Sequence, residues 1–140
     1  GRRVTVLVSR RGCMVSLRLA RRGEVKTYWG YRVRVTNRPL CESTRKGGYD
    51  LVIATSRKGE PIKDVFDEIA SRWGRSKKPL VAFGSPTEGL AEILSREDVR
   101  LEDYADYVVN TVPEQGTETV RTEEAVYATL AILNLIEDSV

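Results

Sequence analysis

The sequence predicts an α/β protein in which a small antiparallel β module precedes helices packed on a parallel sheet. Three observations support this fold class. Residues 4–35 alternate apolar and polar side chains with a period of two. From residue 49 onward, short apolar runs alternate with stretches of helical periodicity. Between them, residues 39–48 have the composition of a turn and predict a linker between a module at 1–38 and a domain at 49–140.

The composition excludes several classes of protein. The 140 residues are 41% hydrophobic and 31% charged, which is typical of a folded domain. No apolar run approaches the roughly 20 residues of a membrane span, so no membrane partner is expected. The absence of histidine excludes Ser-His-Asp and Cys-His nucleophiles within this chain, and we expect no metal site. Cys13 and Cys41 are expected to be free thiols in a reducing cytoplasm, although a disulfide stays open.

The net charge of +3 conceals a strong asymmetry along the chain. Residues 1–38 carry eleven basic side chains and one acidic side chain, a balance of +10. Residues 39–140 carry twelve basic and nineteen acidic side chains, a balance of −7. A basic module joined to an acidic one favours a polyanion, and nucleic acid above all, as the partner of the first module. A solvated arginine-rich surface is the alternative.

The first module reads as three strands of a meander, at residues 4–9, 13–20 and 25–35. Arg-Arg-Gly occurs at both predicted turns, residues 10–12 and 21–23, where glycine can take a positive φ. Each strand has one apolar face for a core and one polar face. Three strands make only part of a small barrel. The polar faces carry basic side chains and one aromatic side chain that suit phosphates and stacked bases, and the predicted RNA-binding residues are Arg18, Lys26, Tyr28, Arg32 and Arg34.

The second module predicts strand–helix–strand–helix–strand–helix. Residues 49–54, 79–84 and 105–110 are short apolar runs typical of buried parallel strands. Helical spacing follows Pro61 as far as Gly74, and again around Leu90 to Leu94. Thr122 is a suitable N-cap for a last helix at 123–136 that is apolar on most of its faces. Such a helix is buried or lies at a subunit interface.

Three loops follow the carboxyl ends of these strands, where open parallel sheets bind ligands. They comprise residues 55–59, 84–89 and 111–121 and are rich in glycine, serine and threonine. The second loop is neither a P-loop nor GxGxxG, which disfavours a dinucleotide binder. The third loop ends at Arg121, beside Glu123 and Glu124. These three residues predict either a cap with surface ion pairs or a pocket wall with a guanidinium that faces the substrate.

Several segments together resemble one family. They are Tyr28-Trp29-Gly30-Tyr31, Gly48-Tyr49-Asp50-Leu51, Ala54 to Gly59, Val109 to Pro113 and, most specifically, Gln115 to Ala125. The chain thereby resembles SPOUT-class RNA methyltransferases, in the archaeal and eukaryotic group that includes the vertebrate centromere-associated SPOUT-domain protein. The resemblance implies an α/β trefoil knot at 49–140, preceded by the later strands of an inserted OB-like β-barrel at 1–38. It also implies that the chain is a C-terminal part of a longer protein.

The resemblance implies S-adenosylmethionine as cofactor, held in the knot mostly by backbone groups of the three loops. Gly84, Gly89 and Gly116 would let the backbone approach it closely. The cofactor-binding residues that the resemblance implies are Thr55, Ala82, Phe83, Gly84, Ser85, Pro86, Gly89, Asn110, Thr111, Val112, Pro113, Gln115, Gly116, Thr117, Thr119 and Val120.

The activity implied is methylation of RNA, with ribosomal RNA expected as the substrate and the basic module holding it. A nitrogen or oxygen nucleophile must lose its proton, so a general base is needed, with Glu123, Glu124 and Glu118 as candidates. Arg121 and Arg57 are expected to bind phosphate or to stabilise negative charge. A homodimer through the knot and last helix is expected, with Tyr127 and Leu135 at the interface. The alternative function is a non-catalytic RNA-binding or scaffold protein that keeps the fold.

Overall fold

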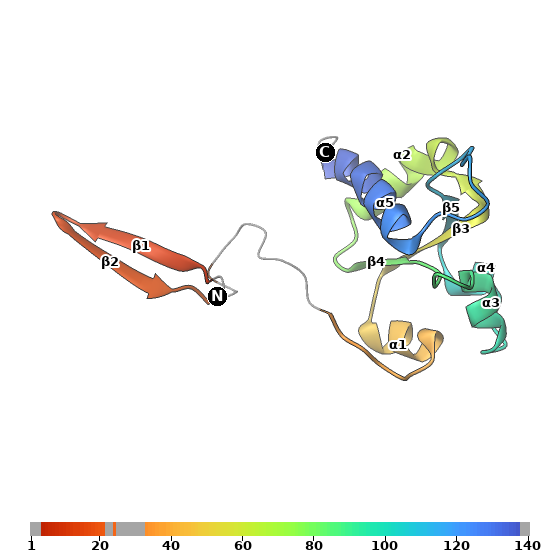
Figure 1. The fold of residues 1–140 in the computed structure, drawn as a ribbon, viewed down its shortest axis with the longest axis horizontal. Coiled ribbons are helices and arrows are strands. Elements are labelled where there is room, and N and C mark those ends of the chain that lie inside the picture. The colour runs from red at the N-terminus through yellow and green to blue at the C-terminus, as the bar shows by residue number, and fades with distance from the viewer. Residues whose placement is uncertain (1–3, 22–23, 25–32, 138–140) are drawn as a thin grey trace. The chain divides into compact units, whose positions relative to one another are not determined.

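The computed structural model describes residues 4–21, 24 and 33–137 (Figure 1). The chain divides into two compact units, residues 1–36 and residues 37–140. Each unit is a separate body and is described by itself.

The first unit contains a β-hairpin of β1 (Val6–Arg11) and β2 (Met14–Leu19) (Figure 1). The strands are antiparallel, with Val6 opposite Leu19 and Val8 opposite Leu17. Gly12 has a φ of 60° in the turn, a conformation that glycine adopts without strain. The first two strands and the first turn of the predicted meander are therefore confirmed. Residues 25–32 of the third predicted strand lie outside the described residues, and residues 33–35 are not in a strand.

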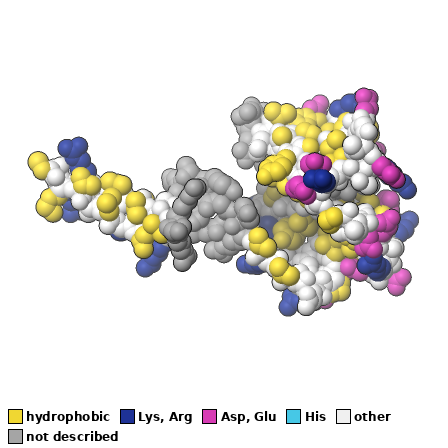
Figure 2. Space-filling model, in the orientation of Figure 1, with side chains coloured by type: hydrophobic (Ala, Val, Ile, Leu, Met, Phe, Trp, Pro, Cys, Tyr) yellow, Lys and Arg dark blue, Asp and Glu magenta, His cyan; other side chains and the backbone are white. Residues whose placement is uncertain are grey.

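The predicted apolar face of the hairpin forms, but it stays exposed. Val8, Val15, Leu17 and Leu19 lie on one face and are each more than 60% exposed (Figure 2). Two strands cannot bury a face between themselves, because a core needs further strands or a helix. The hairpin alone therefore leaves this face uncovered, and the expectation that further strands or the second module cover it stays a prediction.

The second unit contains a three-stranded parallel sheet, as predicted, and helices lie on both of its faces. The strand order is β4-β3-β5, so β3 is central. The elements are α1 (Leu40–Gly47), β3 (Leu51–Pro61), α2 (Ile62–Trp73), β4 (Pro79–Ala82), α3 (Leu90–Ser95), α4 (Leu101–Tyr104), β5 (Tyr107–Asn110) and α5 (Thr122–Glu137).

Two hydrophobic cores lie on the two faces of this sheet. On one face, Leu51 and Ile53 of β3 pack with Ile69 of α2 and Ile136 of α5. On the other face, Ala54 of the same strand packs with residues of α3 and α4, and α1 lies against this cluster. Because successive residues of β3 point to opposite faces, this one apolar run serves both cores.

The predicted linker at 39–48 is wrong, because Leu40–Gly47 forms helix α1. Gly48 ends the helix in the left-handed conformation, with a φ of 63°. The start is capped from far along the chain. The carboxylate of Glu97 accepts hydrogen bonds from the backbone N–H groups of Leu40 (2.6 Å) and Cys41 (2.9 Å). These bonds satisfy two of the donors that a helix start leaves unpaired. Helix α4 is likewise absent from the sequence prediction.

Strand β3 runs further than predicted because its pairing with β5 is interrupted and then resumes. Thr55 and Glu60 both pair with Val109, so residues 56–59 form a bulge between them. At Gly59 a Cβ atom would lie 2.7 Å from the Val108 carbonyl oxygen, which is too close for any side chain. Glycine here lets the strand return to the sheet after the bulge.

Candidate functional site

A cleft of about 420 Å³ opens beside the bulge of β3 and the carboxyl ends of β4 and β5. Its walls come from the β3 bulge, the loop after β4, the loop after β5 and the first turn of α5. Its volume lies in the range of small-molecule sites, about 300–1,000 Å³. The lining residues are Thr55, Ser56, Arg57, Lys58, Phe83, Gly84, Ser85, Pro86, Thr87, Glu88, Gly89, Leu90, Ala91, Glu92, Asn110, Thr111, Val112, Gln115, Glu118, Thr119, Val120, Thr122 and Ala125.

The bulge and the loop after β5 are joined by side-chain hydrogen bonds. The Arg57 guanidinium donates to the backbone oxygen of Glu118 (2.7 Å), which also accepts from the Gln115 amide (3.1 Å). The Asn110 amide donates to the backbone oxygen of Arg57 (3.0 Å) and accepts from the backbone N–H of Val112 (3.0 Å). Together these bonds hold two cleft walls in one arrangement.

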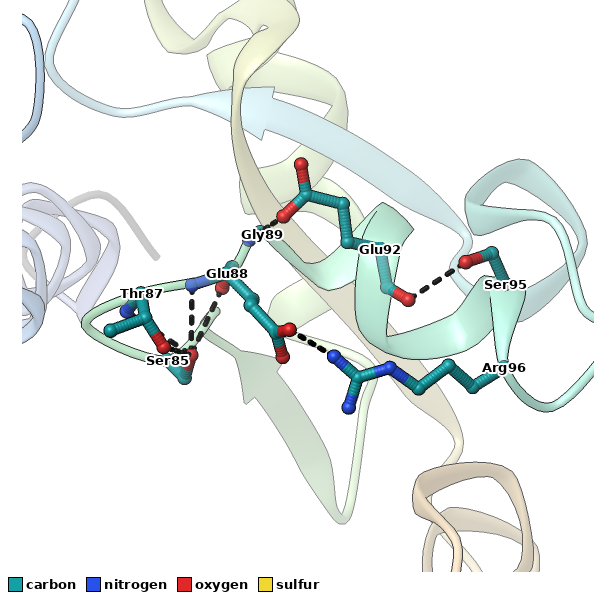
Figure 3. A network of polar contacts seen from close by, with 7 residues as sticks. All are labelled: Ser85, Thr87, Glu88, Gly89, Glu92, Ser95 and Arg96. Atoms are coloured by element: carbon teal, nitrogen blue, oxygen red, sulfur yellow. Dashed lines mark hydrogen bonds and ion pairs between the residues drawn. The ribbon is translucent and has the colours of Figure 1, made fainter.

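The loop after β4 is built around the hydroxyl of Ser85 (Figure 3). This oxygen accepts hydrogen bonds from the backbone N–H groups of Glu88 (2.9 Å) and Thr87 (3.3 Å). The Glu88 carboxylate pairs with Arg96, and the Glu92 carboxylate accepts from the backbone N–H of Gly89 (2.9 Å). The carboxylates of Glu88 in this loop and of Glu92 in α3 are therefore both engaged in contacts within the protein.

A buried pair of hydroxyls connects the cleft to helix α5. Thr111 and Thr129 are 8% and 1% exposed, and their Oγ1 atoms lie 2.8 Å apart. Thr129 also lies 2.7 Å from the backbone oxygen of Ala125, an atom that can only accept. Since a hydroxyl has one proton, Thr129 donates to Ala125 and Thr111 donates to Thr129. The Thr111 oxygen keeps lone pairs but has no proton left for a ligand.

Most residues expected to bind a cofactor lie together in this cleft. Those that line it are Thr55, Phe83, Gly84, Ser85, Pro86, Gly89, Asn110, Thr111, Val112, Gln115, Thr119 and Val120. Ala82 instead lies in the core, and Pro113, Gly116 and Thr117 are not among the lining residues. Some residues that line the cleft were not predicted as site residues in the sequence analysis, among them Ser56 and Lys58 beside Arg57, and Thr122 and Ala125 on the first turn of α5. They lie next to or near residues that the sequence analysis did predict, and this proximity along the chain could have pointed to them.

The predicted catalytic residues divide into two groups. Arg57 lines the cleft, whereas Arg121, Glu123 and Glu124 do not. The helix begins one position earlier than expected, and the Glu124 carboxylate accepts from the backbone N–H of Arg121 (3.1 Å). Glu124 thus serves the helix start, which corrects the assignment of the cap to Thr122.

Two of the predicted RNA-binding residues, Arg18 and Arg34, lie within the described residues and are exposed. Arg18 forms an ion pair with Glu24 (2.8 Å). Lys26, Tyr28 and Arg32 lie outside the described residues.

Within the residues that the structure describes, no group of three or more histidine, cysteine or acidic side chains is placed to hold a metal ion. No helix in that part of the chain has the length and apolar character to cross a membrane. Both cysteines are free thiols.

Residues 1–133 match the model of the family described as "Putative RNA methyltransferase". The chain belongs to this family. The match covers both units and nearly the whole sequence, so the resemblance found in the sequence is confirmed.

The chain is also similar to individual proteins. The chain is 34% identical to the 28S rRNA (uridine-N(3))-methyltransferase of Drosophila melanogaster over 88% of its own length and 26% of that protein. It is 37% identical to the human protein of the same name, over 76% of the chain and 28% of that protein. It is 42% identical to an uncharacterized protein of Haloarcula marismortui, over 62% of the chain and 34% of that protein. The chain therefore spans about a quarter to a third of the relatives it matches.

Proposed function

We propose that the chain contributes the cofactor cleft and catalytic residues of an S-adenosylmethionine-dependent methyltransferase that modifies a uridine in ribosomal RNA. The observation that carries this proposal is the cleft at the carboxyl ends of three parallel strands, in a family of RNA methyltransferases. The relatives named for uridine-N3 methylation of 28S rRNA supply the substrate class.

The residues of the cleft fit this cofactor. At Gly89 a Cβ atom would meet nothing within 4 Å, so the glycine leaves open space for a ligand beside the backbone. Thr111 offers a buried acceptor that suits an N–H or O–H of an adenosine. Bound there, S-adenosylmethionine supplies an electrophilic methyl group. The cleft's own task is positioning, which accounts for much of the catalysis of a displacement at carbon.

Glu118 is the cleft residue best placed to act as general base. Within the described residues, Glu88 and Glu92 are occupied by Arg96 and Gly89, whereas the Glu118 carboxylate has no hydrogen bond or ion pair. The N3 atom of a uridine carries a proton that must leave before the nitrogen can attack. Arg57 holds the backbone of Glu118, so it positions the base and brings positive charge to the same wall.

The first test is calorimetric titration of the chain with S-adenosylmethionine and S-adenosylhomocysteine. We expect both to bind, and we expect Gly89→Val to weaken both at least tenfold while its melting temperature stays unchanged. Equal affinity of a folded Gly89→Val variant would show that the ligand lies elsewhere. No binding by the folded chain would favour the scaffold alternative or a pocket completed by further residues of the whole protein.

A second test separates the base from the cofactor site. Glu118→Gln should keep the affinity for S-adenosylmethionine and lose methyl transfer to RNA by a factor of about 10²–10⁴, the usual contribution of a general base. Glu123→Gln is the matched control, since Glu123 does not line the cleft. If Glu123→Gln rather than Glu118→Gln abolished transfer, the base would be misassigned.

Two finer features of the fold belong to the same proposal. We propose that the second unit is tied as a trefoil knot and that the hairpin is part of an OB-like barrel. The resemblance of residues 115–125 to SPOUT-class methyltransferases supports the first, and the exposed apolar face of the hairpin supports the second. The arginines of the first unit would then bind RNA phosphates, and the salt dependence of RNA binding should flatten when Arg34, an exposed arginine of that unit, is changed to alanine.

A homodimer through α5 is also proposed. Tyr127, Leu130 and Leu135 are 76%, 47% and 58% exposed on a helix whose other face packs in the core. An apolar stripe of this kind is typical of a subunit interface. Light scattering on the wild-type chain and on Tyr127→Glu tests it, and an unchanged mass for the two would refute it.

A further inference from the structure

A cluster of basic side chains lies on the second unit, at the end of the sheet where β3 and β4 begin, opposite the cleft. The segment from Arg72 to Lys78 contains four basic residues, Arg72, Arg75, Lys77 and Lys78, and no acidic one. It connects the end of α2 to the start of β4, where β3 and β4 begin side by side. Residues 39–140 contain twelve basic and nineteen acidic side chains. A third of those basic side chains therefore lie in the seven residues 72–78.

Asp50 fixes the backbone of this segment. Its carboxylate accepts hydrogen bonds from the hydroxyl of Ser76 (2.5 Å) and from the backbone N–H groups of Lys77 (2.8 Å) and Lys78 (2.9 Å). The bond from Ser76, followed by the one from Lys77, lowers the pKa of this carboxyl to about 2. The Asp50 carboxylate is thus engaged in holding the turn, and the side chains of Lys77 and Lys78 remain exposed.

The cluster extends to the end of α1. The Lys78 ammonium donates to the backbone oxygen of Gly47 and lies 5.1 Å from the centre of the Tyr49 ring. Arg45 and Lys46 in the last turn of α1 add two more cations beside it. Lys46 is paired with Glu42, whereas Arg45 and Lys77 have no ion pair within the described residues. We define the basic edge as Arg45, Lys46, Arg72, Arg75, Lys77 and Lys78.

A hollow lies within the basic edge and is lined by Asp50, Arg72, Arg75 and Ser76. The Arg75 guanidinium is held there by hydrogen bonds to the backbone oxygen (3.1 Å) and hydroxyl (3.1 Å) of Ser71. Arg72 pairs with Asp106 (3.1 Å) and lies over the Tyr107 ring at 5.6 Å. Two guanidinium groups held by these contacts therefore line the hollow, and guanidinium is the side-chain group that pairs best with phosphate oxygens.

We propose that the basic edge is a second RNA-binding surface, which holds backbone phosphates of the substrate away from the cleft. The proposal rests on the proposed function for the identity of the polyanion. A run of exposed cations with one aromatic ring suits a phosphate backbone with its sugars and bases, whereas the surrounding module is acidic and would repel it. The cations therefore select where on this unit the RNA can lie.

The experiment uses the whole chain and a fluorescent single-stranded RNA, with the dissociation constant measured over a series of salt concentrations. Lys77→Glu removes an exposed cation of the basic edge. Lys63→Glu is the matched control, because it changes the net charge equally at an exposed lysine outside both the edge and the cleft. We expect Lys77→Glu alone to weaken binding and to lower the logarithmic salt slope by at least about 0.7, the value for one phosphate contact on a single strand. Arg75→Ala should lower the slope in the same way without introducing a negative charge.

The result of this RNA-binding experiment can be told apart from the result of the S-adenosylmethionine titration. Equal slopes for Lys77→Glu, Arg75→Ala and the Lys63→Glu control would overturn the proposal, even if S-adenosylmethionine binds as expected. Loss of slope in a chain that fails to bind the cofactor would support it and count against the proposed function instead. If polyglutamate bound the wild-type chain as tightly as RNA and lost affinity in the same variants, an acidic protein would be the partner and the RNA assignment would be wrong.

Discussion

The buried hydroxyl pair of Thr111 and Thr129 gives a prediction with a definite order of effects. Thr129 donates its proton to the backbone oxygen of Ala125, and Thr111 donates to Thr129. In Thr129→Val the Thr111 hydroxyl loses its acceptor inside the protein. In Thr111→Val the Thr129 hydroxyl keeps its acceptor and loses only a donated bond. The first change should therefore cost more stability than the second.

The magnitudes follow from the burial of the two side chains, 8% for Thr111 and 1% for Thr129. A buried donor left unsatisfied costs about 1–3 kcal/mol, whereas the loss of one ordinary hydrogen bond costs about 0.5–1.5 kcal/mol. The double variant removes both hydroxyls, so no unsatisfied donor remains. Its loss of stability should therefore be smaller than the sum of the losses in the two single variants.

The assay is urea denaturation followed by the helical circular dichroism signal, for the wild type, both single variants and the double variant. Titration with S-adenosylmethionine adds a second readout, since both single variants change an acceptor on the cleft wall. Thr129→Ser should restore both stability and affinity. A larger loss of stability in Thr111→Val than in Thr129→Val would refute the proton order deduced from the contacts.

Three further changes test other parts of the second unit. Gly59→Ala places a Cβ 2.7 Å from the Val108 carbonyl oxygen. It should lower the free energy of unfolding, measured by denaturation, by roughly 1–3 kcal/mol, or prevent folding. A fully stable variant would contradict the described bulge. The pKa of Asp50 is about 2 in the fold, below about 3.9 in the unfolded chain, so the unfolded state takes up its proton first and stability falls as the pH drops from about 5 to 2. Asp50→Asn should be less stable than the wild type at neutral pH and approach it near pH 2, and a constant gap across that range would argue against the Ser76 contact. Glu97→Ala removes the cap from α1 and should speed amide hydrogen exchange in Leu40–Gly47 while β3 stays protected; unchanged exchange in α1 would show that the cap contributes nothing.

The sequence predicted the parts of the fold that local pattern determines. Helix α2 and the parallel strands follow from apolar periodicity, and the hairpin register puts Val8 opposite Leu17 as the alternation requires. Helix α1 could not be predicted in this way. Its segment is polar, and its start depends on Glu97, which approaches from more than fifty residues along the chain. A cap of tertiary origin leaves no local sign.

The candidate site shows the same division. The rule that ligands bind at the carboxyl ends of parallel strands located the cleft, because it depends on the order of the elements. The rule does not say which side chains at a helix start face the ligand. The Glu124 carboxylate is occupied by the backbone N–H of Arg121 at the start of α5, and neither residue lines the cleft, whereas Glu118, in the loop before the helix, does. A shift of one residue in the helix start is enough to exchange such roles, since each residue turns by about 100°.

The bulge in β3 also bears on how this protein can change over evolutionary time. Both ends of the segment Ser56–Gly59 are anchored to the same partner, Val109, so the sheet closes beneath it whatever the segment contains. Residues 56–58 could therefore be exchanged, or their number altered, while the hydrophobic cores on both faces stay intact. Gly59 is the fixed point, because its contact with β5 admits no side chain. Selection for a new substrate could act on Arg57 and its neighbours separately from selection for stability.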